Sequence, residues 1–185
     1  MIHLSNHLSV VPDHRRPQGR MYDLGAILLF SILAVLSSAT SYRKIAAFIA
    51  ARLDLLNTRC GLAWRRAPAH NSIRYALLGL NVNNLEAAFR AHAAELHGTA
   101  GEATSIAIDG KVLRGSFNGF EDRKAAQIVS ALATESTVVL GHVVIHDGDK
   151  DHELAAAQRL IEELGLTGQL FTLDALHAQK KRLSL

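Results

Sequence analysis

The sequence has a single cysteine, Cys60, among its 185 residues. A disulfide within the chain is therefore impossible, and the cytoplasm, which keeps thiols reduced, is the simplest location. Aromatic residues make up only 5% of the chain, while hydrophobic residues make up 49%. The core must be aliphatic and rich in alanine, and a composition this apolar excludes a disordered chain.

Long hydrophobic runs are also lacking. The main one, Leu24–Leu36, has 13 residues between Asp23 and Ser37, whereas a transmembrane helix needs about 20. Flanking residues would bring it only to the borderline, so it predicts a buried core helix and no membrane association. The first 20 residues lack the cationic start, apolar stretch and cleavage site of a signal peptide.

Charge of either sign is not extreme. The formal net charge is +3 and the isoelectric point is about 9.2, a mildly basic balance that permits a nucleic acid partner without requiring one. Arg15, Arg16 and Arg20 form a basic cluster near the start of the chain. We expect an exposed, solvated arm there, with DNA contact as the alternative.

Residues 1–100 have the pattern of a helical domain. Ser41 is expected to cap the second helix, Asn71 or Ser72 the third, and Asn83 with Glu86 resembles a capping box opening the fourth. The short connection between the last two helices fits a helix-turn-helix or an antiparallel pair of core helices. The expected helices cover residues 24–37, 41–56, 71–80 and 83–97.

The pattern changes near residue 100, where "HGTAGE" indicates a domain boundary. Residues 101–185 then predict strands at 105–109, 127–133, 137–145 and 170–173, with a helix at 153–164 before the last strand. A crossover helix returns its strand parallel to an earlier one. The predicted fold class is α+β, with an N-terminal helical domain followed by a β-β-β-α-β core.

Two aspartates occupy equivalent positions. Asp109 ends "IAID" and Asp174 ends "FTLD", each after an expected strand. If those strands are neighbours, both carboxylates emerge at one edge, where ligands of α/β sheets bind. Close carboxylates repel unless a cation lies between them, and Mg²⁺ or Mn²⁺ suits oxygen ligands. Lys111 and Arg114 would then face a phosphate backbone. An ordinary turn after each strand is the alternative.

The sequence resembles the H-repeat-associated insertion-sequence transposases, which are of DDE type. The similar strings, in order, are "RRPQGRMYDLGAILLFSILAVLSSATSYRKIAAF", "IAIDGKVLRGS", "QIVSALA", "VVLGHVVIHDGDKDHEL" and "LFTLDALHAQKK". The resemblance spans about residues 13–181. It implies a ribonuclease-H-like catalytic core with Asp109 and Asp174 as the first two of three acidic residues. It also implies Mg²⁺ or Mn²⁺ as cofactor, insertion-sequence ends as the DNA partner, and a possible homo-oligomer.

The family's third acidic residue, a glutamate on a later helix, has no counterpart after Asp174. Glu153 precedes the second aspartate and is not expected to replace it. Lys150 and Glu153 could support the site, and a solvated helix start is the alternative. We therefore expect a truncated copy with an incomplete core and little strand-transfer activity, and whether the chain is an enzyme stays open. The alternatives are a non-catalytic DNA-binding fragment that regulates transposition and an unrelated metal-dependent nuclease.

Several further side chains are candidates for the site. His177, three residues after Asp174, would lie near the metal or the DNA, or on a helix surface. Lys180 and Lys181, with Arg182, would contact phosphates. A zinc site is not expected, because a fourth ligand is missing from the set of His142, His146 and His152.

Overall fold

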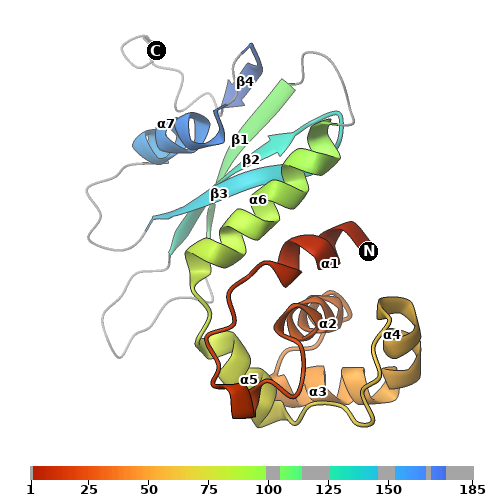
Figure 1. Cartoon of the computed structure of the whole chain (residues 1–185). Coiled ribbons are helices and arrows are strands. Elements are labelled where there is room, and N and C mark those ends of the chain that lie inside the picture. The colour runs from red at the N-terminus through yellow and green to blue at the C-terminus, as the bar shows by residue number, and fades with distance from the viewer. Residues whose placement is uncertain (1, 99–104, 114–125, 146–152, 166–167, 174–185) are drawn as a thin grey trace, which may run out of the picture. The chain divides into compact units, whose positions relative to one another are not determined.

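The computed structural model describes residues 2–98, 105–113, 126–145, 153–165 and 168–173. Helices come first and strands follow, as the predicted α+β class requires (Figure 1). The chain divides into two compact units, Met1–His92 and Ala93–Leu185, and we call them the helical unit and the sheet unit. The helices before the sheet are α1 (Ile2–Ser9), the 3₁₀ turn η1 (Pro17–Gly19), α2 (Leu24–Leu36), α3 (Tyr42–Ala51), α4 (Leu53–Cys60), α5 (His70–Leu78) and α6 (Val82–Gly98).

Helix α2 is the centre of the helical unit, as its apolar sequence predicts. Asp23 caps it, because its side chain accepts a 2.8 Å hydrogen bond from the backbone N–H of Ala26. Ile27 and Phe30 are fully buried. The stretch Pro17–Leu36 is also long and apolar enough to cross a membrane by length and composition, and 56% of its most apolar window is buried within the protein.

Close packing of α1 on α2 depends on Gly25. A Cβ built at this position would lie 3.1 Å from the Cα of Ser9, which is tighter than ordinary packing allows. The glycine therefore lets the two backbones approach each other. The sequence had not predicted α1, which places its Leu8 side chain, fully buried, in the core of this unit.

Helix boundaries differ from the predictions at three places. The expected helix 41–56 is two helices, because Arg52 has non-helical backbone angles between α3 and α4; its predicted cap, Ser41, does accept from the N–H of Lys44. Helix α5 begins at His70 after Ala69, without a side-chain cap. At the start of α6 the side chain of Asn81, not Asn83, accepts a hydrogen bond.

The sheet unit holds four strands in the order β3-β2-β1-β4. Strands β1 (Ser105–Val112), β2 (Gln127–Ala133) and β3 (Val138–Ile145) pair antiparallel, while β4 (Leu170–Leu173) pairs parallel with β1. Helix α7 (Glu153–Leu164) makes the crossover before β4. The prediction that the strand at 170–173 lies beside and parallel to the strand at 105–109 is confirmed.

Strand β1 is longer than predicted. It was expected to end at Asp109, but it continues to Val112 because β2 pairs with it over this whole length, from Ile106 opposite Ala133 to Val112 opposite Gln127. The Asp-Gly pair is a common turn signal, which is why the sequence suggested an end. Hydrogen bonding to a neighbouring strand outweighs that local preference here.

One face of this sheet is covered by α7. The small residues Ala156 and Ala157 of the helix are buried with Ile106, Val129 and Ala131 of the strands. Alanine on both sides lets the helix lie close to the sheet.

Candidate active site

Asp109 lies in β1, one residue past a buried stretch. Ile106 and Ile108 are nearly or fully buried, while Asp109 and Lys111 are exposed. Because side chains alternate along a strand, Asp109 and Lys111 share the face opposite Ile106 and Ile108. The carboxylate and the ammonium group are therefore presented on the same side of β1.

Strand β4 approaches Asp109 from the other side. Its last residue, Leu173, is the register partner of Ile108, the residue immediately before Asp109. Thr172 Oγ1 donates a 3.5 Å hydrogen bond to the carbonyl of Ile106. The predicted partner, Asp174, is next in the sequence and lies outside the described residues.

A row of polar residues crosses the sheet from Asp109. Asp109 is in register with Ser130 of β2, and Ser130 is in register with His142 of β3. Side chains of register partners lie on the same face of a sheet, so the row runs across the face opposite α7. The sequence had listed His142 only for zinc and had missed Ser130, since no local pattern reveals which residues of separate strands come together.

Glu153 reaches the same strand from the start of α7. Its carboxylate lies against Gly110, where a Cβ on Gly110 would overlap it. The side chain is half-buried, so it is not the solvated helix start that the sequence left open. Glycine at position 110 therefore has a steric role in addition to its position after Asp109.

Most of the other predicted site residues fall outside the described ranges. Of the expected DNA contacts, only Lys111 is described, and it is exposed in β1. His142 is half-buried in β3. The remaining candidates, outside the described residues, are Arg114, His146, Lys150, His152, His177, Lys180, Lys181 and Arg182.

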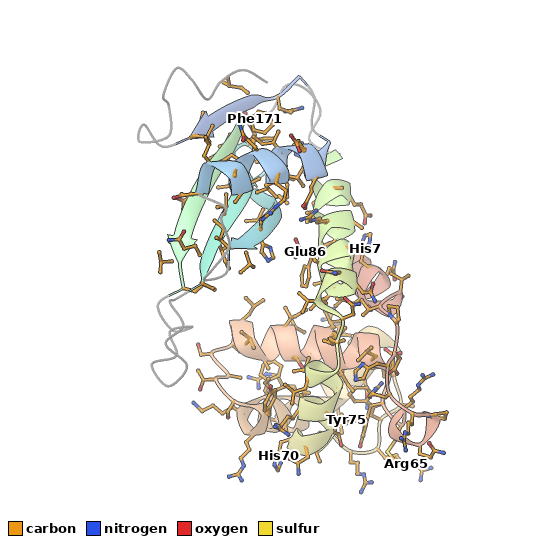
Figure 2. All side chains as sticks on the ribbon, turned by 90° about the vertical axis from the view of Figure 1, so that its left-hand side faces the viewer. His7, Arg65, His70, Tyr75, Glu86 and Phe171 are labelled. Atoms are coloured by element: carbon orange, nitrogen blue, oxygen red, sulfur yellow. The ribbon has the colours of Figure 1, made fainter. Side chains whose placement is uncertain are left out.

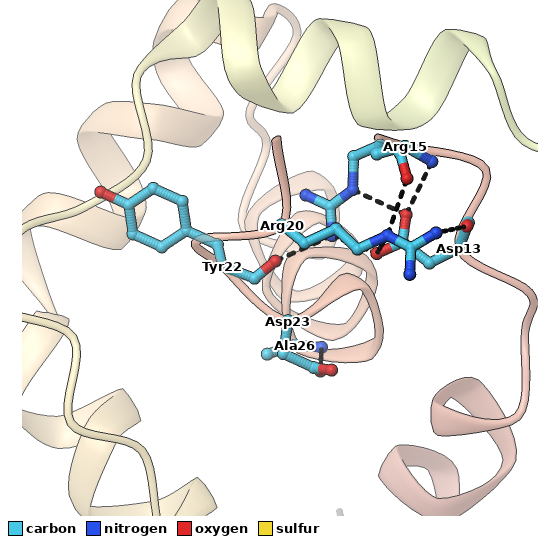
Figure 3. Close-up of polar contacts among 6 residues, drawn as sticks. All are labelled: Asp13, Arg15, Arg20, Tyr22, Asp23 and Ala26. Carbon is cyan, nitrogen blue, oxygen red and sulfur yellow. Dashed lines mark hydrogen bonds and ion pairs between the residues drawn. The ribbon is translucent and has the colours of Figure 1, made fainter. Parts of the chain in front are cut away.

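The arginine cluster near the start is a structural network, not the expected arm (Figure 3). Arg15 is only 3% exposed. Its guanidinium donates to both carboxylate oxygens of Asp13, at 2.9 and 2.8 Å, and to the carbonyl of Tyr22 at 2.8 Å. Arg20 donates to the carbonyls of Arg15 and Asp13. The hydrogen bond from Arg15 is the largest reason that the pKa of Asp13 falls to about 2. Of the three arginines, Arg16 alone has an exposed side chain that makes no hydrogen bond within the described part of the chain.

Comparison with known proteins identifies the family. A protein of Escherichia coli K12 named "Putative transposase YncI" is 34% identical over 178 residues, which are 96% of this chain and 70% of that protein. The chain belongs to the H-repeat-associated family of insertion-sequence transposases. Two further K12 relatives, YbfL and "H repeat-associated putative transposase YhhI", are 31% and 30% identical over 96% of the chain.

A family model also matches the helical unit. The family model "DDE_Tnp_1-associated" covers residues 5–93, which nearly coincide with that unit. The chain spans about half the length of YbfL and YhhI, 46% of each. No solved structure gives a significant match to this chain.

Proposed function

We propose that the sheet unit carries the DNA-cleaving and DNA-joining chemistry of insertion-sequence transposition, on a ribonuclease-H-like core. The observation that carries this is the parallel pairing of β1 and β4 with Leu173 opposite Ile108. The β-β-β-α-β order and the crossover through α7 support the same core. Membership of a transposase family supports DNA as the substrate.

The register argues for a shared site of Asp109 and Asp174. Each aspartate follows directly on one member of the Ile108–Leu173 pair. Each aspartate is one residue, about 3.8 Å along the chain, beyond its member of the pair, and the two strands are about 4.8 Å apart. The two carboxylates would therefore lie side by side. Two carboxylates so placed repel each other unless a cation lies between them.

The donors suit a hard divalent cation. The donor that the described residues offer at this position is the exposed carboxylate of Asp109, whose ligand atoms are oxygens. Mg²⁺ or Mn²⁺ takes such ligands, and it would be held by Asp109 and Asp174. When bound, it polarises a phosphodiester and activates the attacking oxygen.

The protein's own cations would hold the DNA strand. Lys111 lies on the same face of β1 as Asp109, where its ammonium group would contact a phosphate beside the carboxylate. We also propose that Arg114, Lys180 and Lys181 contact DNA phosphates and that His177 lies near the metal or the DNA. The reaction would take place in the cytoplasm, where the DNA is, with a homo-oligomer as the possible assembly.

A second candidate function is DNA binding without cleavage, which would regulate transposition. The observation that favours it is the basic character of the helical unit: residues 1–92 hold eleven Lys and Arg against four Asp and Glu. A chain could bind DNA through this unit whether or not the sheet unit cuts it. The two candidates differ in whether strand cleavage occurs.

The test separates metal binding from cleavage. Mn²⁺ is titrated into the full chain and followed by electron paramagnetic resonance, with Asp109→Asn and Asp174→Asn as variants and exposed Asp54→Asn of α4 as the control. We expect both site variants, but not the control, to lose the tight Mn²⁺ site. Unchanged binding in either site variant would show that the shared site is wrong. Nicking of plasmid carrying the DNA that flanks the gene, abolished by Asp109→Asn, would support catalysis; DNA binding without nicking would favour the second candidate.

A further inference from the structure

The two units of the chain carry opposite charge. The helical unit, residues 1–92, has eleven Lys and Arg and four Asp and Glu, a formal net charge of +7; residues 93–185 have nine and thirteen, a net charge of −4. The overall charge of +3 conceals this division. A surface that attracts a polyanion is therefore to be sought on the helical unit.

The stretch between Asp54 and Glu86 carries positive charge that no acidic residue within it offsets. Residues 55–85 contain four arginines and no Asp or Glu. All four are exposed, and within the described part of the chain none of them makes an ion pair or a side-chain hydrogen bond. They are Arg59, Arg65, Arg66 and Arg74. This differs from Arg15, whose charge is used within the fold.

Arg65 and Arg66 are held on a fixed segment. Just before them, Asn57 donates to the carbonyl of Trp64 at 2.9 Å and accepts from its N–H at 3.2 Å. The Trp64 ring packs edge-on against Tyr22 and Phe30, with centroids 4.8 and 5.3 Å apart. Just after them, Tyr22 donates to the carbonyl of Ala67, and Pro68 is fully buried. Two exposed arginines thus stand between two anchored points.

Helix α5 follows directly and presents a polar face. Ile73 and Ala76 are buried, while Asn71, Arg74 and Tyr75 are exposed, Tyr75 by 61%. Residues at spacings of three and four lie on one side of a helix, so these three share its solvent face. Arg65, His70 and Tyr75 appear at the same end of the helical unit (Figure 2).

We propose that this arginine surface, made of Arg65, Arg66 and Arg74 with Asn71 and Tyr75, binds double-stranded DNA. Helix α5 has nine residues, and an α-helix with its side chains is about 10–12 Å across, which fits a major groove about 12 Å wide. The paired arginines before it contact backbone phosphates and position the helix, while Asn71 and Arg74 face the base edges. The choice of DNA as partner rests on the proposed function; the location of the surface does not.

The face chemistry favours DNA over an anionic membrane. A membrane-binding helix buries a broad apolar face with tryptophan, phenylalanine or leucine. The exposed face of α5 has one aliphatic residue, Leu78, beside asparagine, arginine and tyrosine. These polar side chains can form hydrogen bonds with bases and phosphates, whereas a lipid tail offers no hydrogen-bonding group.

The experiment measures binding of the full chain to a fluorescent duplex of about 30 base pairs by anisotropy, in EDTA, over a range of salt concentrations. The test variant is Arg65→Ala with Arg66→Ala. We expect its affinity to fall by at least about tenfold at roughly 100 mM salt, and the salt slope to fall by about 2, because two phosphate contacts are lost. The control is Arg43→Ala with Lys44→Ala, which removes the same charge from exposed positions of α3 and should have less than half of that effect on the slope.

A second variant tests helix α5. Arg74→Ala, measured on the DNA that flanks the gene and on a scrambled duplex, should reduce the preference for the first over the second by several-fold, since base contacts carry specificity. Thermal melting of each variant establishes that it is folded. Equal losses in the test and control pairs, or an unchanged salt slope, would overturn the proposal. So would binding of the wild type to anionic vesicles but not to DNA.

The outcome is independent of the metal site. Because EDTA is present, loss of binding in the arginine variants cannot arise from Asp109 or its cation. Binding that depends on Arg65 and Arg66 without any Mn²⁺ site would leave the surface correct and the catalytic proposal wrong. A Mn²⁺ site and nicking with no effect of the arginines would show the reverse.

Discussion

The carboxylate of Glu153 lies where a side chain on Gly110 would begin. This contact joins the first residue of α7 to the strand that carries Asp109. A Cβ at position 110 would also come 3.2 Å from the Cγ of Glu153, so an alanine there must displace the glutamate. The two positions should therefore be energetically coupled.

We expect Gly110→Ala to lower the stability of the sheet unit by about 1 kcal/mol in the wild type. With Glu153→Ala, the same change should be neutral or stabilising by about 0.5–1 kcal/mol, because alanine loses less backbone entropy than glycine in a strand. Urea unfolding of the four proteins gives the coupling energy. Gly98→Ala, where a Cβ meets no atom within 4 Å, is the control; equal effects of Gly110→Ala in both backgrounds would contradict the contact.

Asp13 should make the stability of the helical unit depend on pH. Its pKa is lowered from 3.8 to about 2, first by the hydrogen bond from Arg15. A depressed pKa gives stability that is complete above about pH 4 and is lost as the pH falls through about 2, roughly 2 kcal/mol in all. Urea unfolding between pH 5 and pH 2 measures this loss. Asp13→Asn should remove it, and an unchanged pH profile in that variant would contradict the assignment.

Arg15 has a larger role than its carboxylate partner. Replacing it by alanine removes the guanidinium donors to Asp13 and to the carbonyl of Tyr22, and only the backbone N–H of residue 15 still donates to Asp13. We expect a loss of roughly 3 kcal/mol. Arg16→Ala, at an exposed neighbour, should change the unfolding free energy by less than about 0.5 kcal/mol, and similar losses in the two variants would refute the network.

Ser31 is a buried polar side chain in α2. It is 5% exposed, and its hydroxyl has no hydrogen-bond partner among the residues that the structure describes. It borders an apolar hollow of about 290 Å³ formed with Leu28, Ile32 and Phe89. Ser31→Ala should stabilise the protein by about 1 kcal/mol, since an unsatisfied buried hydroxyl is costly. Ser72→Ala, exposed on α5, is the control and should gain less than half as much.

Replacing Asn57 should affect both the stability of the helical unit and the arginine surface, because Asn57 holds Trp64 next to Arg65. Asn57→Ala removes both hydrogen bonds to Trp64, at a cost of about 1–3 kcal/mol. If the surface binds DNA, the variant should also bind more weakly while still folded, because Arg65 and Arg66 are no longer held in place. Thermal melting and anisotropy on the same samples check both; weaker folding with full DNA affinity would separate the two roles.

The sequence predicts the order of the elements well, because each has a clear hydrophobic pattern. The strand of Leu170–Leu173 is an example: a crossover helix before it leaves few places in the sheet. Local signals failed where tertiary structure outweighed them. The Asp109-Gly110 pair looked like a turn, yet pairing with β2 keeps it in the strand. The amphipathic run across Arg52 gives no sign of the break between α3 and α4.

The candidate site was predictable only in part. Asp109 and Lys111 are two residues apart, so their shared face follows from strand alternation once β1 is known to continue past Asp109. The approach of Glu153 to Gly110 depends on how α7 packs, which periodicity does not reveal. Arg15 was expected in solvent because charged side chains usually are, but Asp13 neutralises it and makes burial affordable.

The hydrophobic cores of the helical unit and the sheet unit have no described residue in common. Cooperativity in unfolding arises from a shared core, so each unit should melt as its own calorimetric transition. A single midpoint would then misrepresent the protein. Changes at Asp13, Ser31 and Asn57 should move one transition, and changes at Gly110 and Glu153 the other.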